Sequence, residues 1–172
     1  QRQMCIRDRI TFKEFVTGTN KKIKYKRKVD GKEQVNEIEV RIPAGTQNGS
    51  KLRANFQGNG KNGSFGNLII EIETETDSRF KVEGFDLYTK VNLPLTTALL
   101  GGILEVPAPS GIKKIKISEC TQNGKIVKIA NEGIYRTESG SLRGNLFVEL
   151  NVEMPKKLSA KQKQIIKEFS EN

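Results

Sequence analysis

The sequence predicts an all-β fold of two tandem homologous β-sandwich-like domains with short helical turns, followed by a C-terminal α-helix. Two repeated phrases indicate the duplication. Thr-Gln-Asn-Gly stands at residues 46–49 and again at residues 121–124, and Gly-Asn-Leu opens an apolar strand pattern at residues 66–72 and 144–150. A repeat of about 75 residues is typical of two copies of a domain, because solenoids use shorter and more numerous units. Short alternating segments between turn residues predict strands in both copies.

The first domain is predicted to span residues 10–80. It follows residues 1–9, which show neither strand alternation nor helix periodicity and which we expect to be a non-native or disordered tail. A strand end and one helical turn, stopped by Gly18, precede an alternating strand over residues 21–28. Asp30-Gly31 then predicts a tight turn. The remaining strands of this domain are expected at residues 37–42, 52–56 and 68–72.

The second domain is predicted to span residues 81–156. It repeats the helical turn that ends at glycine, here Gly101, and its apolar segments are again short. Short strands at regular spacing favour a sandwich or a barrel-like unit. The strands of this domain are expected at residues 86–91, 103–106, 112–117, 126–129 and 146–152.

Residues 157–172 are predicted to form a helix of a different character. Ser159 and Gln162 have the spacing of a capping box. Ile165, Ile166 and Phe169 fall on one side of the helix and lysines fall elsewhere. Because so short a helix is marginal alone in water, its apolar stripe must be buried. It either packs on its own domain or meets a second copy of the chain, and we expect the second arrangement, a homodimer.

Composition bounds the function. The formal charge of +10 suggests nucleic acid, a membrane surface or an acidic partner, although a merely solubilising surface explains it equally well. The chain has no histidine, and Cys5 and Cys120 are far apart, so no zinc cluster, thiol pair or histidine base is available. No GxSxG motif is present. We therefore expect no catalytic residue, no metal and no cofactor, and a protein that is not an enzyme.

The same observations suggest a compartment. Two isolated cysteines favour a reducing environment. No segment approaches the ~18 apolar residues that a membrane span requires, and the chain does not open on a signal-peptide pattern. We expect a cytoplasmic protein that does not associate with membranes.

The basic segment at residues 21–32 is the strongest candidate for binding. Ile23 and Tyr25 share one face of the predicted strand, and basic residues take the other face. An edge strand of this kind can receive an extended peptide by strand addition, with backbone hydrogen bonds giving affinity and the apolar stripe giving selectivity. The pattern alone favours a simpler alternative, in which Ile23 and Tyr25 pack in the core. Phosphate contact is a further alternative, but no recognition helix or set of stacking aromatics accompanies the basic run.

Several phrases, taken in order, resemble one known family. Residues 41–53 read Arg-Ile-Pro-Ala-Gly-Thr-Gln-Asn-Gly-Ser-Lys-Leu-Arg, and residues 93–102 read Leu-Pro-Leu-Thr-Thr-Ala-Leu-Leu-Gly-Gly. Residues 158–163 read Leu-Ser-Ala-Lys-Gln-Lys. Together they are similar to the C-terminal region of DnaJ-type co-chaperones, the J-domain proteins, over nearly all of residues 10–172. A short connection at residues 27–36 replaces the CxxCxGxG zinc modules of some members, which places the chain with the zinc-less class B type.

The resemblance implies a function. A groove of the first domain would bind unfolded client polypeptides and pass them to a seventy-kilodalton, DnaK-type heat-shock chaperone. The matching groove positions are Ile23, Tyr25 and Ile70, and Lys21, Lys22 and Lys24 would meet the acidic tail of that chaperone. Leu158, Ile165, Ile166 and Phe169 would form the dimerisation helix. The J domain with its His-Pro-Asp signature does not occur in these residues, so we do not expect them alone to stimulate a partner ATPase. The rival functions are a nucleic-acid-binding module, since some relatives bind DNA, and a scaffold that pairs only with itself.

Overall fold

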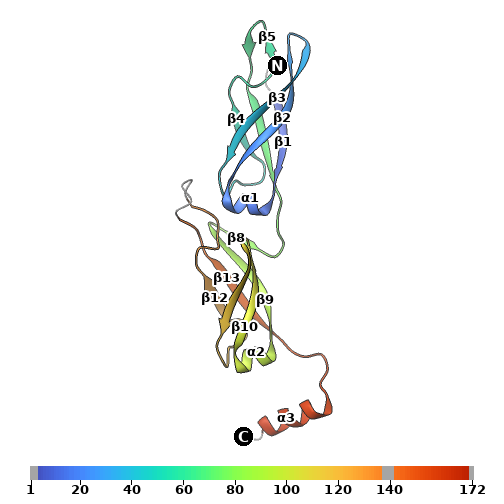
Figure 1. Cartoon of the computed structure of the whole chain (residues 1–172), viewed down its shortest axis with the longest axis vertical. Coiled ribbons are helices and arrows are strands. Elements are labelled where there is room, and N and C mark those ends of the chain that lie inside the picture. The colour runs from blue at the N-terminus through green and yellow to red at the C-terminus, as the bar shows by residue number, and fades with distance from the viewer. Residues whose placement is uncertain (1–3, 137–141, 171–172) are drawn as a thin grey trace. The chain divides into compact units, whose positions relative to one another are not determined.

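The structure is a computed structural model that describes residues 4–136 and 142–170. It is mostly β, with two short helices and a C-terminal helix, as the sequence predicts (Figure 1). The chain divides into two compact units: Gln1–Thr89 with Ala108–Gly111 and Lys128–Phe147, and Lys90–Pro107 with Ile112–Val127 and Val148–Asn172. The first unit combines the first copy of the repeat with segments of the second copy, whereas the second unit holds segments of the second copy and the C-terminal residues. The domain limits given by the repeat, residues 10–80 and 81–156, therefore stay predictions.

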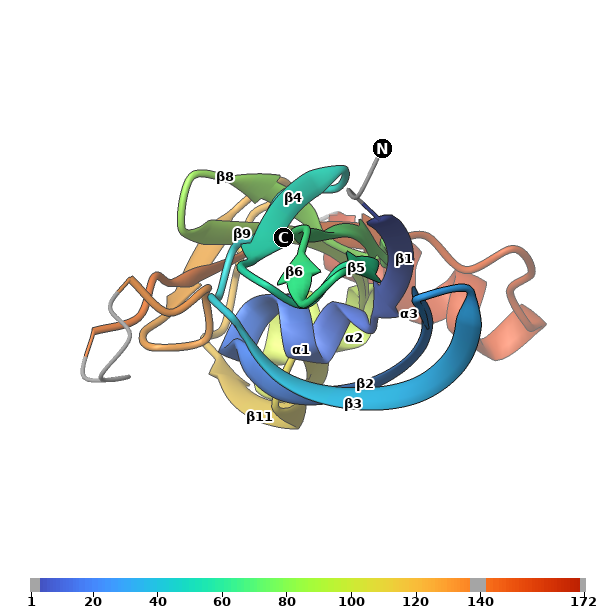
Figure 2. The same ribbon diagram turned by 90° about the horizontal axis from the view of Figure 1, so that it is seen from above.

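The first copy of the repeat forms two sheets. One has the strand order β1-β7-β4 and the other the order β3-β2-β5-β6. Figure 2 shows β2 and β3 running side by side along one curve, as their unbroken antiparallel register requires. Asp30 and Gly31 join them with positive φ angles of 47° and 82°, which is the two-residue hairpin turn that the sequence predicts. The elements are β1 (Met4–Ile10), α1 (Phe12–Thr17), β2 (Thr19–Val29), β3 (Lys32–Ile42), β4 (Ser50–Ala54), β5 (Gly60–Lys61), β6 (Ser64–Phe65) and β7 (Leu68–Thr74).

The second copy forms a sheet of order β12-β13-β9-β8 and a two-stranded sheet of β10 and β11. A helical turn again follows the long strand, as the sequence predicts. The elements are β8 (Lys81–Glu83), β9 (Asp86–Pro94), α2 (Leu95–Leu100), β10 (Gly102–Ala108), β11 (Gly111–Ile117), β12 (Ile126–Ile129), β13 (Leu146–Glu153) and α3 (Ala160–Ser170).

The Thr-Gln-Asn-Gly phrase forms a turn that makes the same hydrogen bonds in both copies of the repeat. In the first copy, Asn48 Oδ1 accepts a hydrogen bond from the Thr74 backbone N–H at 3.0 Å. In the second copy, Asn123 Oδ1 accepts one from the Val152 N–H at 2.8 Å. The threonine of each phrase also donates to the carbonyl three residues before it. Each copy thus ties a turn to the end of a central strand, β7 or β13, so the repeat indicates architecture and not a binding site.

Helix α1 connects β1 to β2 at one end of the sheets (Figure 1). Thr11 and Glu14 form a capping box, in which the Thr11 N–H donates to Glu14 Oε2 at 2.8 Å. This backbone hydrogen bond is the main reason that the pKa of the Glu14 carboxyl lies below its ordinary value. Gly18 ends the helix with a φ of 71°, and a Cβ there would lie 3.0 Å from the Ala44 nitrogen. Glycine is required at this position.

Residues 4–9 correct one expectation. Instead of a tail, they form most of β1, which pairs in parallel with β7 from Met4 opposite Leu68 to Ile10 opposite Thr74. Their side chains do alternate, with every second residue partly or fully buried. Asp8 occupies one of the inward positions. The inward face of β1 is therefore not uniformly apolar, and the sequence does not show the apolar alternation that indicates a strand. The charge of Asp8 is compensated by Lys21, whose Nζ lies 3.1 Å from Asp8 Oδ2.

The core of the first copy lies between its two sheets. Central strand β7 contributes three side chains with no exposed surface, Leu68, Ile70 and Ile72. A buried aliphatic side chain of this size is worth roughly 1.5–3 kcal/mol relative to full exposure. β7 therefore positions β1 and β4, which pair with it on either side. The other largely buried apolar residues of this copy are Ile10, Phe15, Val16, Ile23, Tyr25, Ile42 and Phe80.

Candidate functional site

Strand β2 presents two different faces. Ile23 and Tyr25 point into the sandwich and expose 8% and 4% of their surfaces. Lys22, Lys24 and Lys26 alternate with them and are exposed on the outer face. The sequence pattern therefore gives the faces of this strand correctly.

The backbone of β2 has one unpaired edge. Two hydrogen bonds give its orientation: the Lys28 N–H donates to Asn59 Oδ1, and the Asp30 N–H donates to the Gly60 carbonyl. Even-numbered residues therefore direct their backbone groups away from β3, because neighbouring residues of an antiparallel strand alternate in direction. Over residues 20–26 no strand of the described chain pairs with this edge. Lys22, Lys24 and Lys26 thus offer free N–H and C=O groups to an incoming strand.

Strand β1 has a similar unpaired edge. The Met4 N–H and the Ile10 carbonyl bond toward β7, so the odd-numbered residues direct their backbone groups the other way. Within the described residues β1 pairs with β7 alone. Its Arg9 carbonyl accepts a hydrogen bond from Lys21 Nζ, which ties β1 to β2 at the end near α1. We call the two unpaired strand edges, residues 5–9 of β1 and residues 22–26 of β2, the edge site.

The three predicted peptide-binding residues are brought together, but in the core. Ile70, on β7, has no exposed surface and lies between Ile6 and Leu52 in the register of its sheet. Ile23 and Tyr25 face inward from the other sheet. The Tyr25 hydroxyl is satisfied by donating to Gln57 Oε1 at 2.8 Å. Their burial agrees with the core-packing alternative of the sequence analysis. What lies open beside them is the backbone edge of β2.

The three predicted tail-binding lysines do not share a surface. Lys22 and Lys24 are on the exposed outer face, opposite Glu39 and Glu37 of β3. Lys24 Nζ lies 3.8 Å from Glu37 Oε2, so part of its charge is already balanced. Lys21 is on the inner face, where Asp8 and the Arg9 carbonyl hold it. An acidic segment on the outer face would therefore meet Lys22, Lys24 and Lys26 rather than Lys21.

A small cavity lies at the far end of the edge site. It has a volume of about 310 Å³, and its lining includes Met4 of β1, residues 26–28 of β2, and Asn59. Sequence reasoning missed Asp8 and Asn59, which border the two ends of the site. The Gly-Asn-Gly run at residues 58–60 was the only signal for Asn59, and it does not show that this side chain reaches β2.

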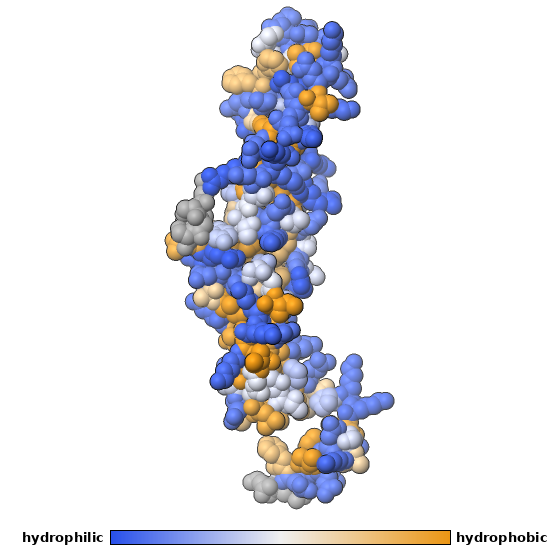
Figure 3. All heavy atoms as spheres, viewed as in Figure 1, coloured by the Kyte–Doolittle hydropathy of each residue, from blue (hydrophilic) through white to orange (hydrophobic). Residues whose placement is uncertain are grey.

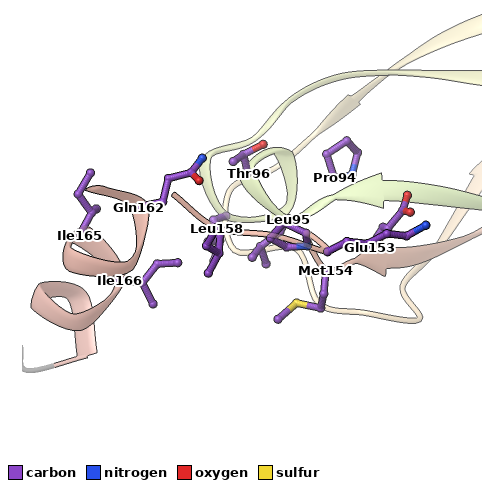
Figure 4. A pocket seen from close by; sticks show the side chains of 12 residues that line it. Pro94, Leu95, Thr96, Glu153, Met154, Leu158, Gln162, Ile165 and Ile166 are labelled. Atoms are coloured by element: carbon purple, nitrogen blue, oxygen red, sulfur yellow. The ribbon is translucent and has the colours of Figure 1, made fainter. Parts of the chain in front are cut away.

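Helix α3 presents a second candidate surface. Every residue of Ala160–Ser170 is exposed, and Phe169 exposes 75% of its surface. Hydrophobic side chains lie together on the visible face of this helix (Figure 3). A cavity of about 480 Å³ lies between the helix and the end of β9. In Figure 4, Ile166 points from the helix toward Leu158 and Met154. The predicted capping box is present, since the Ser159 N–H donates to Gln162 Oε1 at 2.8 Å.

The comparisons with known proteins decide the family. The family described as the DnaJ C terminal domain matches residues 6–155. The chain belongs to the DnaJ C-terminal domain family. It is 35% identical over 156 residues to a protein named Chaperone protein DnaJ from Fusobacterium nucleatum subsp. polymorphum, covering 88% of this chain and 39% of that protein. It is 37% identical over 139 residues to the Chaperone protein DnaJ of Burkholderia mallei strain SAVP1, covering 78% of this chain and 36% of that protein.

Family membership confirms the predicted resemblance and places the chain among DnaJ C-terminal domains, which are not enzymes. The chain spans little more than a third of the length of the curated relatives it matches. Among residues 4–136 and 142–170, no helix is long and apolar enough to cross a membrane. No cluster of three or more His, Cys, Asp or Glu residues that could hold a metal occurs in that same part of this DnaJ-family chain. The zinc-less class remains a prediction.

Proposed function

We propose that this chain binds extended segments of non-native polypeptides by strand addition to the free edge of β2. The observation that carries the proposal is the unpaired row of backbone groups at Lys22, Lys24 and Lys26, beside the apolar inner positions Ile23 and Tyr25. Backbone hydrogen bonds tolerate any client sequence, because every residue except proline offers the same groups. A bound segment would add its inward side chains beside the edge of the core.

The β2 edge is favoured over the β1 edge for two reasons. Its inward neighbours Ile23 and Tyr25 are apolar or largely so, whereas the β1 edge has the charged Asp8 at an inward position. The β1 edge has also lost one acceptor, because the Arg9 carbonyl is taken by Lys21. A client strand therefore finds more free backbone partners and a more apolar flank on β2.

We further propose that the bound client is handed to a seventy-kilodalton, DnaK-type heat-shock chaperone in the cytoplasm. The support is family membership together with the outer face of β2, where exposed lysines alternate along the strand. Lys22 and Lys24 would attract the acidic tail of that chaperone. Lys21, which is held by Asp8 and the Arg9 carbonyl, would act in the client site instead. Glu37 and Glu39 on the neighbouring strand reduce the net charge of this face, so the attraction would be weak and sensitive to salt.

A second copy of the chain is the proposed partner of α3. The apolar side chains of Ile165, Ile166 and Phe169 are 54%, 46% and 75% exposed, and an isolated helix of this length is marginal in water. Leu158 lines the cavity beside the helix and would continue the same apolar surface. Dimerisation would bury this surface and would place two client edges in one particle, which raises avidity for long unfolded chains.

Replacing Lys24 with proline tests the client site. The Lys24→Pro variant removes one outward N–H without breaking the β2–β3 ladder, since proline is tolerated on strand edges. Two variants serve as controls. Lys24→Ala removes the charge and keeps the N–H, and Arg7→Pro removes an equivalent outward N–H from β1.

Binding of a fluorescein-labelled peptide that alternates leucine and serine is measured by anisotropy, and aggregation of a denatured client by light scattering. We expect Lys24→Pro alone to lose most binding and most suppression of aggregation. Equal loss in Arg7→Pro would move the site to β1. Full activity of Lys24→Pro would refute strand addition on β2. Steep loss of wild-type peptide binding with added salt would favour a charge-driven site and the rival nucleic-acid function.

A further inference from the structure

The free edge of β2 is closed at both ends by side chains. At the end near α1, Lys21 extends from the inner face of β2 to β1, where its Nζ donates to the Arg9 carbonyl and lies 3.1 Å from Asp8 Oδ2. The side chains of Lys21 and Asp8 are only 29% and 23% exposed. Asp8 Oδ2 is buried and has no hydrogen-bond partner within the described residues, so the Lys21 charge is its compensation. This bridge spans the space that an added strand would need beyond residue 21.

At the other end, Asn59 occupies the edge in the manner of a partner strand. Its Oδ1 accepts from the Lys28 N–H at 2.9 Å, and the next outward group, the Asp30 N–H, is taken by the Gly60 carbonyl. The 310 Å³ cavity lies directly beside this closure, between Met4 and residues 26–28. There is thus space for a peptide up to Asn59, but the backbone group at Lys28 is already satisfied.

We propose that Lys21 and Asn59 are end stops that limit client pairing to Lys22–Lys26, and so set the length of segment that the chain recognises. This inference rests on the proposed function, since it concerns the same edge. The open edge covers five residues of β2, or about 17 Å at ~3.3 Å per residue. A client residue beyond this limit exchanges an existing hydrogen bond for a new one and gains nothing net. Lys21 and Asn59 are therefore specificity-determining residues.

A length series of peptides tests the limit. The probes alternate leucine and serine over about three to eleven residues, and each carries the same fluorescein-labelled Gly-Ser tail. For the wild-type chain we expect affinity to rise roughly fivefold for each added backbone hydrogen bond. The rise should stop at about five to seven residues, because the edge offers three outward residues between its two stops.

The Asn59→Ala variant should move this limit. It releases the Lys28 N–H, so peptides of about nine residues should bind roughly fivefold more tightly than peptides of about seven. Asn59→Asp keeps an acceptor oxygen and should restore the wild-type limit. Asn48→Ala is the matched control, because it removes the same kind of side-chain cap from the Thr74 N–H, far from β2 in sequence and in another sheet.

Lys21→Met tests the other stop. Because it leaves Asp8 without its cation, the double variant Asp8→Asn with Lys21→Met accompanies it, and circular dichroism checks that each variant is folded. A limit that stays unchanged in both Asn59→Ala and the double variant overturns the end stops while leaving the client site standing. Affinity that keeps rising with length in the wild-type chain does the same. Failure of the wild-type chain to bind any peptide of the series overturns the proposed function, and the end stops with it.

Discussion

Replacement of Gly144 by alanine should strongly destabilise the chain, because the fold leaves no space for a single methyl group there. A Cβ at Gly144 would overlap the Phe85 carbonyl oxygen and would lie 2.5 Å from the Phe85 carbonyl carbon and 2.9 Å from Asp86 Oδ1. The first two atoms belong to the backbone, so no rotation of a flexible side chain relieves the overlap. Gly144 has no unusual positive φ, and the expected cost is therefore steric rather than conformational.

The magnitude of this destabilisation follows from the hydrogen bonds around Gly144, where its backbone approaches Phe85 and Asp86. Phe85 accepts a hydrogen bond from the Ile134 N–H at 2.8 Å, and Asp86 accepts one from the Asn145 N–H at 2.6 Å. Overpacking costs about 1–3 kcal/mol, and loss of two hydrogen bonds adds about 1 kcal/mol each. We expect Gly144→Ala to lower the free energy of unfolding by about 3–5 kcal/mol.

Urea denaturation followed by circular dichroism measures this loss, with Gly63→Ala as the matched control. Gly63 has a φ of 72° and open space where its Cβ would stand. That variant should therefore lose only about 1 kcal/mol, the cost of a left-handed alanine. A loss below 1 kcal/mol for Gly144→Ala, or equal losses for the two variants, would refute the steric reasoning.

Two further predictions concern α3 and α1. In solution the wild-type chain should have about twice its monomer mass of 19.3 kDa. The double variant Ile165→Ser with Phe169→Ser should reduce the mass measured by light scattering to that of a monomer, whereas Lys163→Ser should not. A wild-type monomer would refute the dimer. Because the pKa of Glu14 is lowered in the fold, its carboxylate stabilises fully above the pKa of the unfolded chain and loses that contribution as pH falls through the folded value. Between about pH 6 and pH 3 the wild-type chain should lose stability relative to Glu14→Gln. Parallel denaturation curves across that range would contradict this prediction.

The sequence predicts much of this fold because local alternation is strong where strands are apolar. The faces of β2, the Asp30-Gly31 turn and the capping box of α3 all follow from residues within a few positions of one another. β1 could not be recognised in this way, since Asp8 interrupts its inward face and its compensating charge, Lys21, lies on another strand.

The candidate site was predictable in part. An edge strand with lysines on one face was expected at β2, and the structure gives it that form. The burial of Ile23 and Tyr25 was one of two alternatives that the pattern left open. The role of Asn59 depends on a contact with Lys28, 31 positions away, that no local pattern encodes. The part of the site that follows from local patterns was therefore predictable, and the part that depends on long-range contacts was not.

The parallel pairing of β1 with β7 has a consequence for the order of folding. Each residue of β1 meets a partner 64 positions later in the chain, and pairing at such separation is slow because a long loop must close first. During synthesis β1 leaves the ribosome before β7 and remains unpaired until β7 has followed it. One wall of the edge site is thus the last part of its sheet to be completed, and a ribosome that pauses between these strands would hold this domain with β1 unpaired.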